Sequence, residues 1–285
     1  GETAMRQRRW LIVLMSPLAL WLGLLFLAPL ATMVVFMFRA GSFGPEHDVF
    51  TLENYRTFFG NPTYSRLLLS SARISFVASV LSILLAYPVA YYLAFQAGAH
   101  RLTLLLVIIV PAWISFLLRV FAWKLILGSG GLLNIVLMAA GLVDEPAPIL
   151  LYSRSAVIVA LVYSYMPFVA LPIFVALQRI DRSLIEAASD LGGTGWQTFR
   201  DVILPLSMPG VAAAFFLIFI PTLGEYVTPL LLGGTEGLMF GNVIQSQFAR
   251  ALNWPLGSLM SLAVLLFTLA LLAVFVRLVR LEDWV

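Results

Sequence analysis

The feature that most restricts the fold of this chain is a set of six long runs that carry almost no charge. Five runs contain no Asp, Glu, Lys or Arg, and one contains Glu225 as its single charged residue. A helix needs about 20 apolar residues to cross a hydrocarbon core about 30 Å thick, and backbone polar groups in lipid must pair within their own segment. The runs therefore predict membrane-spanning helices. They cover residues 10–38, 74–99, 102–118, 155–178, 211–234 and 256–276.

Composition supports an integral membrane protein. Charged residues make up 11% of the chain and the mean hydropathy is +0.99, whereas about a quarter of the residues in soluble domains are charged. We expect one all-α transmembrane domain over residues 1–285 with six transmembrane helices. The expected spans are about 10–38, 74–99, 102–127, 155–178, 209–233 and 255–277, with a polar loop at 179–208.

The first run begins after Arg6, Arg8 and Arg9, as a secretory signal would. A cleavable signal has an apolar core of only about 7–15 residues, so we expect this longer run to remain as an anchor. The chain has no cysteine, and its two histidines, His47 and His100, are far apart. Disulfides are therefore excluded, and no metal site is expected.

Arginine usage predicts the orientation, because cytoplasmic loops of membrane proteins carry an excess of Lys and Arg. With the amino terminus inside, nine arginines fall in cytoplasmic segments and six in external ones. The nine are Arg6, Arg8, Arg9, Arg101, Arg179, Arg182, Arg200, Arg277 and Arg280, and the six are Arg39, Arg56, Arg66, Arg73, Arg154 and Arg250. We therefore expect a multi-pass protein with both termini and the 179–208 loop in the cytoplasm.

The loop between the fourth and fifth spans is polar and contains helix signals. Residues 183–210 read SLIEAASDLGGTGWQTFRDVILPLSMPG. Ser183 and Glu186 have the spacing of a capping box, which predicts the start of a helix. The glycines at 192, 193 and 195 predict its end.

A second short helix is expected after this glycine turn. Thr194 can cap it, and Pro205 and Pro209 are expected to stop it before the fifth span. From the residues alone, two interpretations stay open. The helices form either a docking surface for a partner or an ordinary loop on the lipid headgroups, with Glu186 as a cap.

Glu225 is the most informative charge within a predicted span. It lies between Pro221 and Pro229 and beside Gly224, so the helix is expected to be bent or unwound there. A charged side chain at the centre of a membrane helix costs about 2.5–3.5 kcal/mol on insertion scales and marks a functional site. Glu225 with Tyr226 is a candidate cation site; the alternative is that Glu225 pairs with a basic residue and stabilises packing.

Other residues of the spans have weaker signals. Arg119 and Lys124 are expected to extend their long side chains outward to the membrane interface. Three aromatic residues are candidates for cation–π contacts with an organic cation, although such residues more often serve in packing or at the interface. They are Trp113, Tyr163 and Tyr165.

The chain carries no nucleotide-binding signature. A phosphate-binding loop needs glycines before a Lys-Ser or Lys-Thr pair, and the single lysine, Lys124, is followed by Leu125. We therefore expect a transport subunit that binds no cofactor and is not an enzyme. Any ATP and Mg²⁺ would be bound by a partner ATPase.

The 179–208 loop resembles the EAA signature loop of the membrane subunits of binding-protein-dependent ABC importers. That signature has EAA, three residues, G, nine residues and then I-x-L-P, and Val202 stands here at the isoleucine position. The stretches PAWISFLLRVFAWKLIL and PTLGEYVTPLLLGG are similar to the spermidine/putrescine branch of that family.

The resemblance implies the type I ABC importer permease fold, with a coupling helix that docks on a cytoplasmic ATPase dimer. It also implies a second homologous permease, an extracytoplasmic substrate-binding protein and polyamine uptake across the bacterial cytoplasmic (inner) membrane by alternating access. The residues implied to shape the ATPase contact are Glu186, Ala187, Ala188, Asp190, Gly192, Leu204 and Pro205.

Three other functions remain open. A related importer could carry another small organic solute, and a proton-coupled secondary transporter could use Glu225 as its proton carrier. A channel or membrane scaffold is also possible, but it would leave both the 179–208 loop and Glu225 without a role.

Overall fold

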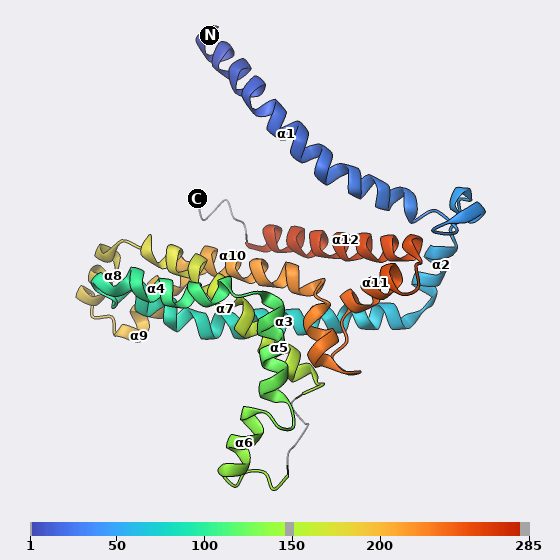
Figure 1. Cartoon of the computed structure of the whole chain (residues 1–285). Helices are drawn as coiled ribbons and strands as arrows, with labels where there is room; N and C mark the ends of the chain where they lie inside the picture. The colour runs from blue at the N-terminus through green and yellow to red at the C-terminus, as the bar shows by residue number, and fades with distance from the viewer. Residues whose placement is uncertain (1, 146–150, 280–285) are drawn as a thin grey trace. The chain divides into compact units, whose positions relative to one another are not determined.

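The computed structural model describes residues 2–145 and 151–279, and nearly all of the regular structure there is helical (Figure 1). The chain divides into two compact units, Gly1–Pro62 with Ile244–Ala270 and Thr63–Val243 with Leu271–Val285.

The longer elements are α1 (Glu2–Phe36), α2 (Glu53–Gly60), α3 (Pro62–Phe95), α4 (Arg101–Ile109), α5 (Phe116–Leu127), α6 (Leu132–Ala139), α7 (Arg154–Gln178), α8 (Arg182–Asp190), α10 (Leu204–Leu223), α11 (Phe240–Ala249) and α12 (Trp254–Val279). The shorter ones are α9 (Gly195–Thr198), η1 (Gly44–Asp48), η2 (Gly98–His100), η3 (Val110–Trp113), η4 (Phe199–Ile203) and η5 (Pro229–Gly233).

Within the described residues, six helical stretches are long and apolar enough to cross a membrane. This confirms the prediction of an all-α protein with six spanning helices. The stretches are Leu14–Phe36, Pro62–Phe95, Phe116–Ala139, Arg154–Gln178, Gly195–Leu223 and Trp254–Arg277.

The third stretch differs most from the expected one. The apolar run 102–118 is interrupted: α4 leads into the short turn η3, and Ile114 and Ser115 are extended before α5 begins. Pro111 in η3 has no backbone N–H to continue the helix. The stretch that is long and apolar enough by composition is Phe116–Ala139, which contains the turn at 128–131 between α5 and α6. The boundaries predicted for this span, 102–127, remain a prediction.

The unit that contains the amino terminus is stabilised by hydrogen bonds between side chains and the backbone. The amide of Asn54 on α2 donates to the carbonyls of Met37 at 3.2 Å and Arg39 at 2.8 Å. The hydroxyl of Ser42 donates to the Leu252 carbonyl at 2.5 Å and accepts from the Trp254 amide at 2.8 Å. The short helices α2 and α11 lie outside the six membrane-length stretches.

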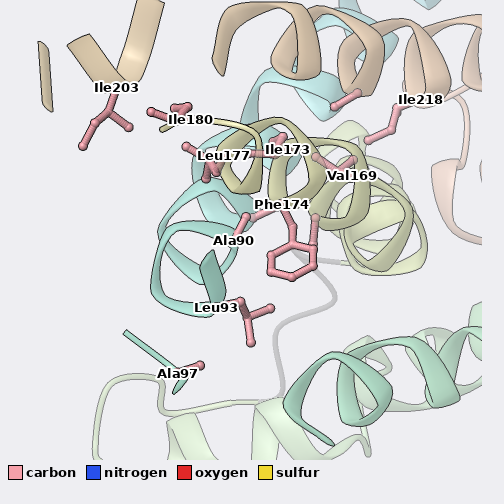
Figure 2. Close-up of a cluster of buried hydrophobic side chains, with 13 residues drawn as sticks. Ala90, Leu93, Ala97, Val169, Ile173, Phe174, Leu177, Ile180, Ile203 and Ile218 are labelled. Atoms are coloured by element: carbon pink, nitrogen blue, oxygen red, sulfur yellow. The ribbon is translucent and has the colours of Figure 1, made fainter. Parts of the chain in front are cut away.

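In the second unit, α3, α7 and α10 pack around a shared apolar core (Figure 2). Residues from all three helices are fully buried there, including Ala90, Ile173 and Ile218. Helices α7 and α10 lie side by side along much of their length (Figure 1). Gly210 permits this approach, because a Cβ at this position would lie 2.8 Å from the Pro172 carbonyl oxygen.

Candidate functional site

The first helix of the 179–208 loop, α8, begins with an aspartate cap. The Asp181 carboxylate accepts from the Ser183 backbone amide at 3.0 Å. This bond, together with the Ser183 hydroxyl, lowers the pKa of Asp181. The expected capping role of Ser183 is wrong, because α8 starts one residue earlier and Ser183 lies inside its first turn.

The end of α8 confirms the predicted glycine stop. Gly192 has φ +83°, a left-handed conformation that glycine adopts without steric cost. The amides of Gly192 and Gly193 bond to the carbonyls of Ser189 at 2.9 Å and Ala188 at 3.0 Å. These bonds satisfy the last carbonyls of α8 and reverse the chain direction.

The second helix of the loop, α9, confirms the predicted cap at Thr194. Its hydroxyl accepts from the Gln197 amide at 3.3 Å, and the Gln197 side chain accepts from the Thr194 amide at 2.8 Å. This reciprocal pair is a capping box. It fixes the direction in which the chain enters the fifth membrane-length stretch.

The prediction that Pro205 and Pro209 stop this helix is wrong. The π-helical turn η4 joins α9 to α10 without a break, and the Leu204 amide bonds to the Phe199 carbonyl. A π turn shifts the hydrogen-bond register by one residue, and Pro205 then falls in the first turn of α10, where a missing N–H costs little. Pro209 removes a single bond from a long helix, which membrane helices tolerate.

The outer surface of the 179–208 loop is exposed and partly apolar. Helix α8 has no buried residue, and the side chains of Leu184, Leu191 and Trp196 are 47%, 90% and 68% exposed. Glu186, Ala187 and Asp190 are also exposed. The loop encloses a hollow of about 320 Å³, lined by Ala188, Leu191, Gly192, Gly193, Gln197, Thr198, Asp201 and Val202. Exposed apolar residues around a hollow are typical of an interaction surface.

The inner surface of this loop is anchored in the core of the bundle. Ile203 is 2% exposed and belongs to the core shown in Figure 2. The Tyr87 hydroxyl on α3 bonds to the Ser207 hydroxyl on α10 at 2.8 Å, and the Tyr87 ring meets Phe199 edge-on with centroids 5.8 Å apart. These contacts join the loop to the packed core formed by α3, α7 and α10.

The second feature of the site is the predicted break at Glu225, which the structure confirms. Helix α10 ends at Leu223, and Glu225 and Tyr226 have no helical assignment. One Glu225 carboxylate oxygen accepts from the amides of Val227 at 2.8 Å and Thr228 at 3.3 Å. A carboxylate at this position offsets the partial positive charge of the helical segment that follows.

Residues of α11 stabilise the non-helical backbone at the break. The Asn242 amide on α11 donates to the Tyr226 carbonyl at 2.8 Å, and its carbonyl accepts from the Met239 amide at 3.0 Å. Gly241 lies against the Gly224 and Glu225 carbonyl oxygens, where a side chain would not fit. Backbone groups that lost helical partners are therefore satisfied inside the protein, as the membrane interior requires.

Arg119 lies in a different place from the one expected. Its side chain is 8% exposed rather than extended to the interface, and its guanidinium donates to the Ser164 carbonyl of α7 at 2.9 Å. The guanidinium also lies 5.8 Å from the Phe116 ring centroid. Lys124 lies 6.0 Å from the Tyr152 ring centroid. Arg119 is therefore buried between α5 and α7.

The structure gives the candidate aromatic residues different surroundings. Tyr165 packs with Phe116 of α5, with ring centroids 6.5 Å apart. Tyr226 is next to Glu225 in the chain and 43% exposed. The structure thus packs Tyr165 against α5 and leaves Tyr226 accessible beside Glu225.

The other two candidate aromatic residues have their own surroundings. The Tyr163 ring packs edge-on against Trp123 at 5.5 Å, and Trp113 is 85% exposed on η3. Over the same residues, no three His, Asp or Glu side chains lie close enough together to hold a metal ion.

Several residues of this region escaped the sequence reasoning. Phe116, Ser164 and Asn242 are ordinary members of apolar or amphipathic stretches, and no motif distinguishes them. Asn242 lies 16 residues after Tyr226 in the sequence, so only the folded chain brings the two together. One feature of the sequence could have indicated that Arg119 is buried: it lies within the apolar stretch 102–127.

A helical membrane protein with six membrane-length stretches, an exposed helical loop between the fourth and fifth, and a charged break directly after the fifth has the features of a multi-pass transport permease. The chain matches the family described as binding-protein-dependent transport system inner membrane component over residues 8–283. The chain therefore belongs to this family and is a multi-pass permease of the inner membrane.

Known relatives agree with this membership. The spermidine/putrescine transport system permease protein PotB of Haemophilus influenzae is 37% identical over 259 residues, which are 90% of each chain. The inner membrane ABC transporter permease protein YdcU of Escherichia coli is 31% identical and covers 93% of this chain and 88% of its own. A bacterial ABC transporter involved in import of the acidic polysaccharide alginate has a TM-score of 0.74 at 16% identity, with 96% of both chains covered. This last match supports the fold alone.

Proposed function

We propose that this protein is the membrane subunit of an ATP-driven importer that moves a small organic cation, a polyamine such as spermidine or putrescine, into the cytoplasm by alternating access. The observation that carries the proposal is the Glu225 carboxylate at the break that follows the fifth membrane-length helix of a permease. A carboxylate has the charge that an ammonium group requires, and ionisable residues of membrane-spanning domains mark substrate pathways. The 37% identity to a spermidine/putrescine permease supports the same substrate class.

The substrate contacts that we propose are Glu225, Tyr226 and Tyr165. One carboxylate oxygen of Glu225 accepts hydrogen bonds from backbone amides. The other makes no hydrogen bond or ion pair with the described residues, and it is the oxygen that we assign to an ammonium. The rings of Tyr165 and Tyr226 offer cation–π contacts to the methylene-linked ammonium groups of a polyamine. Trp113 and Tyr163 stay candidates from the sequence for the same kind of contact.

The second part of the proposal assigns the 179–208 loop to coupling. Helix α8 would dock on a partner ATPase dimer, which binds ATP and Mg²⁺ and performs the hydrolysis that this chain does not. The exposed face of α8 and the hollow beside it support a docking surface, and the packing of Ile203 supports transmission into the bundle. The proposed contact residues are Glu186, Ala187, Ala188, Asp190, Gly192, Leu204 and Pro205.

The remaining partners follow from the same proposal. A second homologous permease would complete the translocation path, and an extracytoplasmic binding protein would deliver the substrate. Because the ATPase is cytoplasmic, the 179–208 loop and both termini would lie on that side. The excess of arginines in the corresponding segments supports this orientation.

The proposal is tested by reconstituting the permease in liposomes with its candidate ATPase and second permease. We expect uptake of labelled spermidine that requires ATP and the binding protein and is competed by unlabelled putrescine. Uptake that follows a proton gradient without the ATPase would support the secondary-transporter alternative instead. ATP-dependent uptake that polyamines do not compete would leave the importer in place and refute the substrate.

A further inference from the structure

The π turn η4 is a weak point in the helix that joins the 179–208 loop to α10. The Leu204 amide bonds to the Phe199 carbonyl, five residues back, at this turn. An α-helix would use the carbonyl four residues back, so the turn contains one residue more than the α register allows. Pro205 follows at once and has no N–H to donate to the turn. The helix can therefore change its hydrogen-bond register most easily at this turn.

One side chain of α3, Tyr87, contacts the helix on both sides of this turn. The Tyr87 ring meets the Phe199 ring edge-on, with centroids 5.8 Å apart and planes at 87°. The Tyr87 hydroxyl oxygen lies 2.8 Å from the Ser207 hydroxyl oxygen. Phe199 is the first residue of the turn, and Ser207 follows its last residue, Ile203, by one turn of helix. Tyr87 thus spans the whole π turn.

The direction of the hydroxyl bond follows from the other bond of Ser207. The Ser207 hydroxyl donates to the Leu204 carbonyl at 3.0 Å. Because a hydroxyl has one proton to donate, the Tyr87 hydroxyl is the donor to Ser207. Ser207 is fully buried, and a hydrogen bond in such surroundings is stronger than one in water. The bonds therefore run from Tyr87 through Ser207 to Leu204, the residue that closes the π turn.

These contacts fit one register only. If the extra residue of the turn were lost from the register, the residues after it would rotate by about 100° and move by about 1.5 Å relative to Phe199. Ser207 would then turn away from Tyr87, while Phe199 stayed against its ring. Tyr87 can contact both residues only while the π register is kept.

The Phe199 ring has further contacts that do not depend on the Tyr87 hydroxyl. Tyr91, one turn along α3, meets it edge-on with centroids 6.1 Å apart, and Trp196 stacks on it at 5.4 Å. The Tyr91 hydroxyl makes no hydrogen bond with any residue that the structure describes. The bond from Tyr87 to Ser207 is therefore what separates the role of Tyr87 from that of its neighbour.

We propose that Tyr87 is a positioning residue that holds η4 in the π register, so that movement of the 179–208 loop reaches α10 instead of being absorbed by a change of register. This inference rests on the proposed coupling role of the loop. Without the bond to Ser207, the ATPase would still move the loop, but α10 would follow it less often. ATP hydrolysis would then continue with less import.

The first test measures the ATP hydrolysed per spermidine imported by the reconstituted complex. Tyr87→Phe keeps the ring against Phe199 and leaves Ser207 bonded to Leu204, so the fold is preserved. We expect the ratio to rise about fivefold, the factor that one typical net hydrogen bond contributes. Ser207→Ala should act in the same direction, and the double variant should be no worse than the singles because both remove one bond. Tyr91→Phe, the matched control, should leave the ratio unchanged.

The second test measures the register directly and needs neither substrate nor ATP. The Leu204 amide donates the bond that defines the π turn, and its hydrogen exchange reports how often this bond opens. We expect exchange about fivefold faster in Tyr87→Phe than in the wild type, and no change in Tyr91→Phe. Equal exchange in the wild type and in Tyr87→Phe would overturn the inference.

A purely structural role for Tyr87 makes a different prediction. It would lower the amount of complex, and ATP hydrolysis and uptake would fall in proportion. A complex that retains the ATPase but shows an unchanged ratio in Tyr87→Phe would therefore overturn this inference alone. A wild-type chain that does not copurify with the ATPase would instead refute the proposed coupling role of the loop.

Discussion

The 179–208 loop and the break at Glu225 are both polar interruptions of an apolar helical chain, but they leave different groups unsatisfied. In the loop, caps at Asp181 and Thr194 satisfy the backbone, and apolar side chains such as Leu191 are exposed. In the break, Asn242 and Glu225 satisfy the backbone, and charge is left inside the protein.

The difference indicates what each region binds. Exposed apolar residues beside a hollow favour a protein partner, whereas a half-buried carboxylate at the end of a membrane-length helix favours a small cation. The same kind of sequence, a few polar and turn residues between apolar runs, therefore serves two purposes. What decides between them is the group that remains without a partner after the backbone has been satisfied.

The largest effect is expected where the loop would meet its partner. Glu186→Arg reverses an exposed charge at the proposed ATPase contact, and a central interface residue is worth about 2 kcal/mol or more, or about thirtyfold in binding. We expect ATP-dependent uptake to fall by about that factor while membrane insertion is unchanged. The measurement is uptake per inserted complex, with copurification of the ATPase. Wild-type uptake by this variant would remove the coupling assignment.

The break should respond to the loss of its charge by a smaller factor. Glu225→Gln keeps the shape and the hydrogen-bond acceptor but removes the negative charge, and a hydrogen bond to a charged group contributes about 1.5–3 kcal/mol. We expect the KM for spermidine to rise about tenfold or more in competition assays, with ATPase association unchanged. If ATPase association is lost instead, the assignment of ATPase docking to the loop and of substrate binding to the break is wrong.

The loop can be probed more finely through its two glycines at open positions. Gly192 has φ +83° and Gly195 does not, and a Cβ at either residue meets nothing within 4 Å. Gly192→Ala should therefore strain the turn by about 1 kcal/mol and lower uptake about fivefold, whereas Gly195→Ala is the matched control without this strain. Equal effects of the two substitutions on uptake per complex would show that the turn geometry is not what matters.

The smallest effect is expected at the Asp181 cap and depends on pH. The pKa of Asp181 is lowered by the Ser183 amide and hydroxyl, so its stabilising effect is complete above the usual aspartate pKa of about 3.9. The effect is lost as the pH falls through the lowered value. Protection of the Ser183 amide from hydrogen exchange, corrected for intrinsic rates, should fall in that range and stay constant near neutral pH.

The matched variant for this test is Asp181→Asn, which keeps a capping acceptor without the titratable charge. Its amide protection should show no such dependence on pH. A dependence of the same size in both proteins would assign it to another group.

Much of the fold could be predicted because the deciding physics is local. The lengths of the charge-free runs indicated six spanning helices, and Thr194 and Gly192 marked helix ends through bonds to neighbours in the chain. The break was predictable from two prolines and a glycine around Glu225. Errors appeared where a local rule was overruled, as when the π turn before Pro205 allowed the helix to continue.

The candidate site was predictable only in part. Glu225 was evident as an isolated charge, but Arg119 was expected at the interface because a long side chain can reach water from its position. The structure buries it instead, where the Ser164 carbonyl and the Phe116 ring receive it. No local pattern connects those partners to Arg119.

By itself, the sequence determined that this protein lies in a membrane, how many times it can cross it, and where two polar interruptions occur. These follow from run length and from hydrogen bonds between residues close in the chain. The tertiary structure alone decided that Arg119 bonds to the Ser164 carbonyl of α7 and that Ile203 anchors the 179–208 loop in the core. Such contacts join distant segments, and their free energy depends on which helix faces pack together, which short stretches of sequence do not encode.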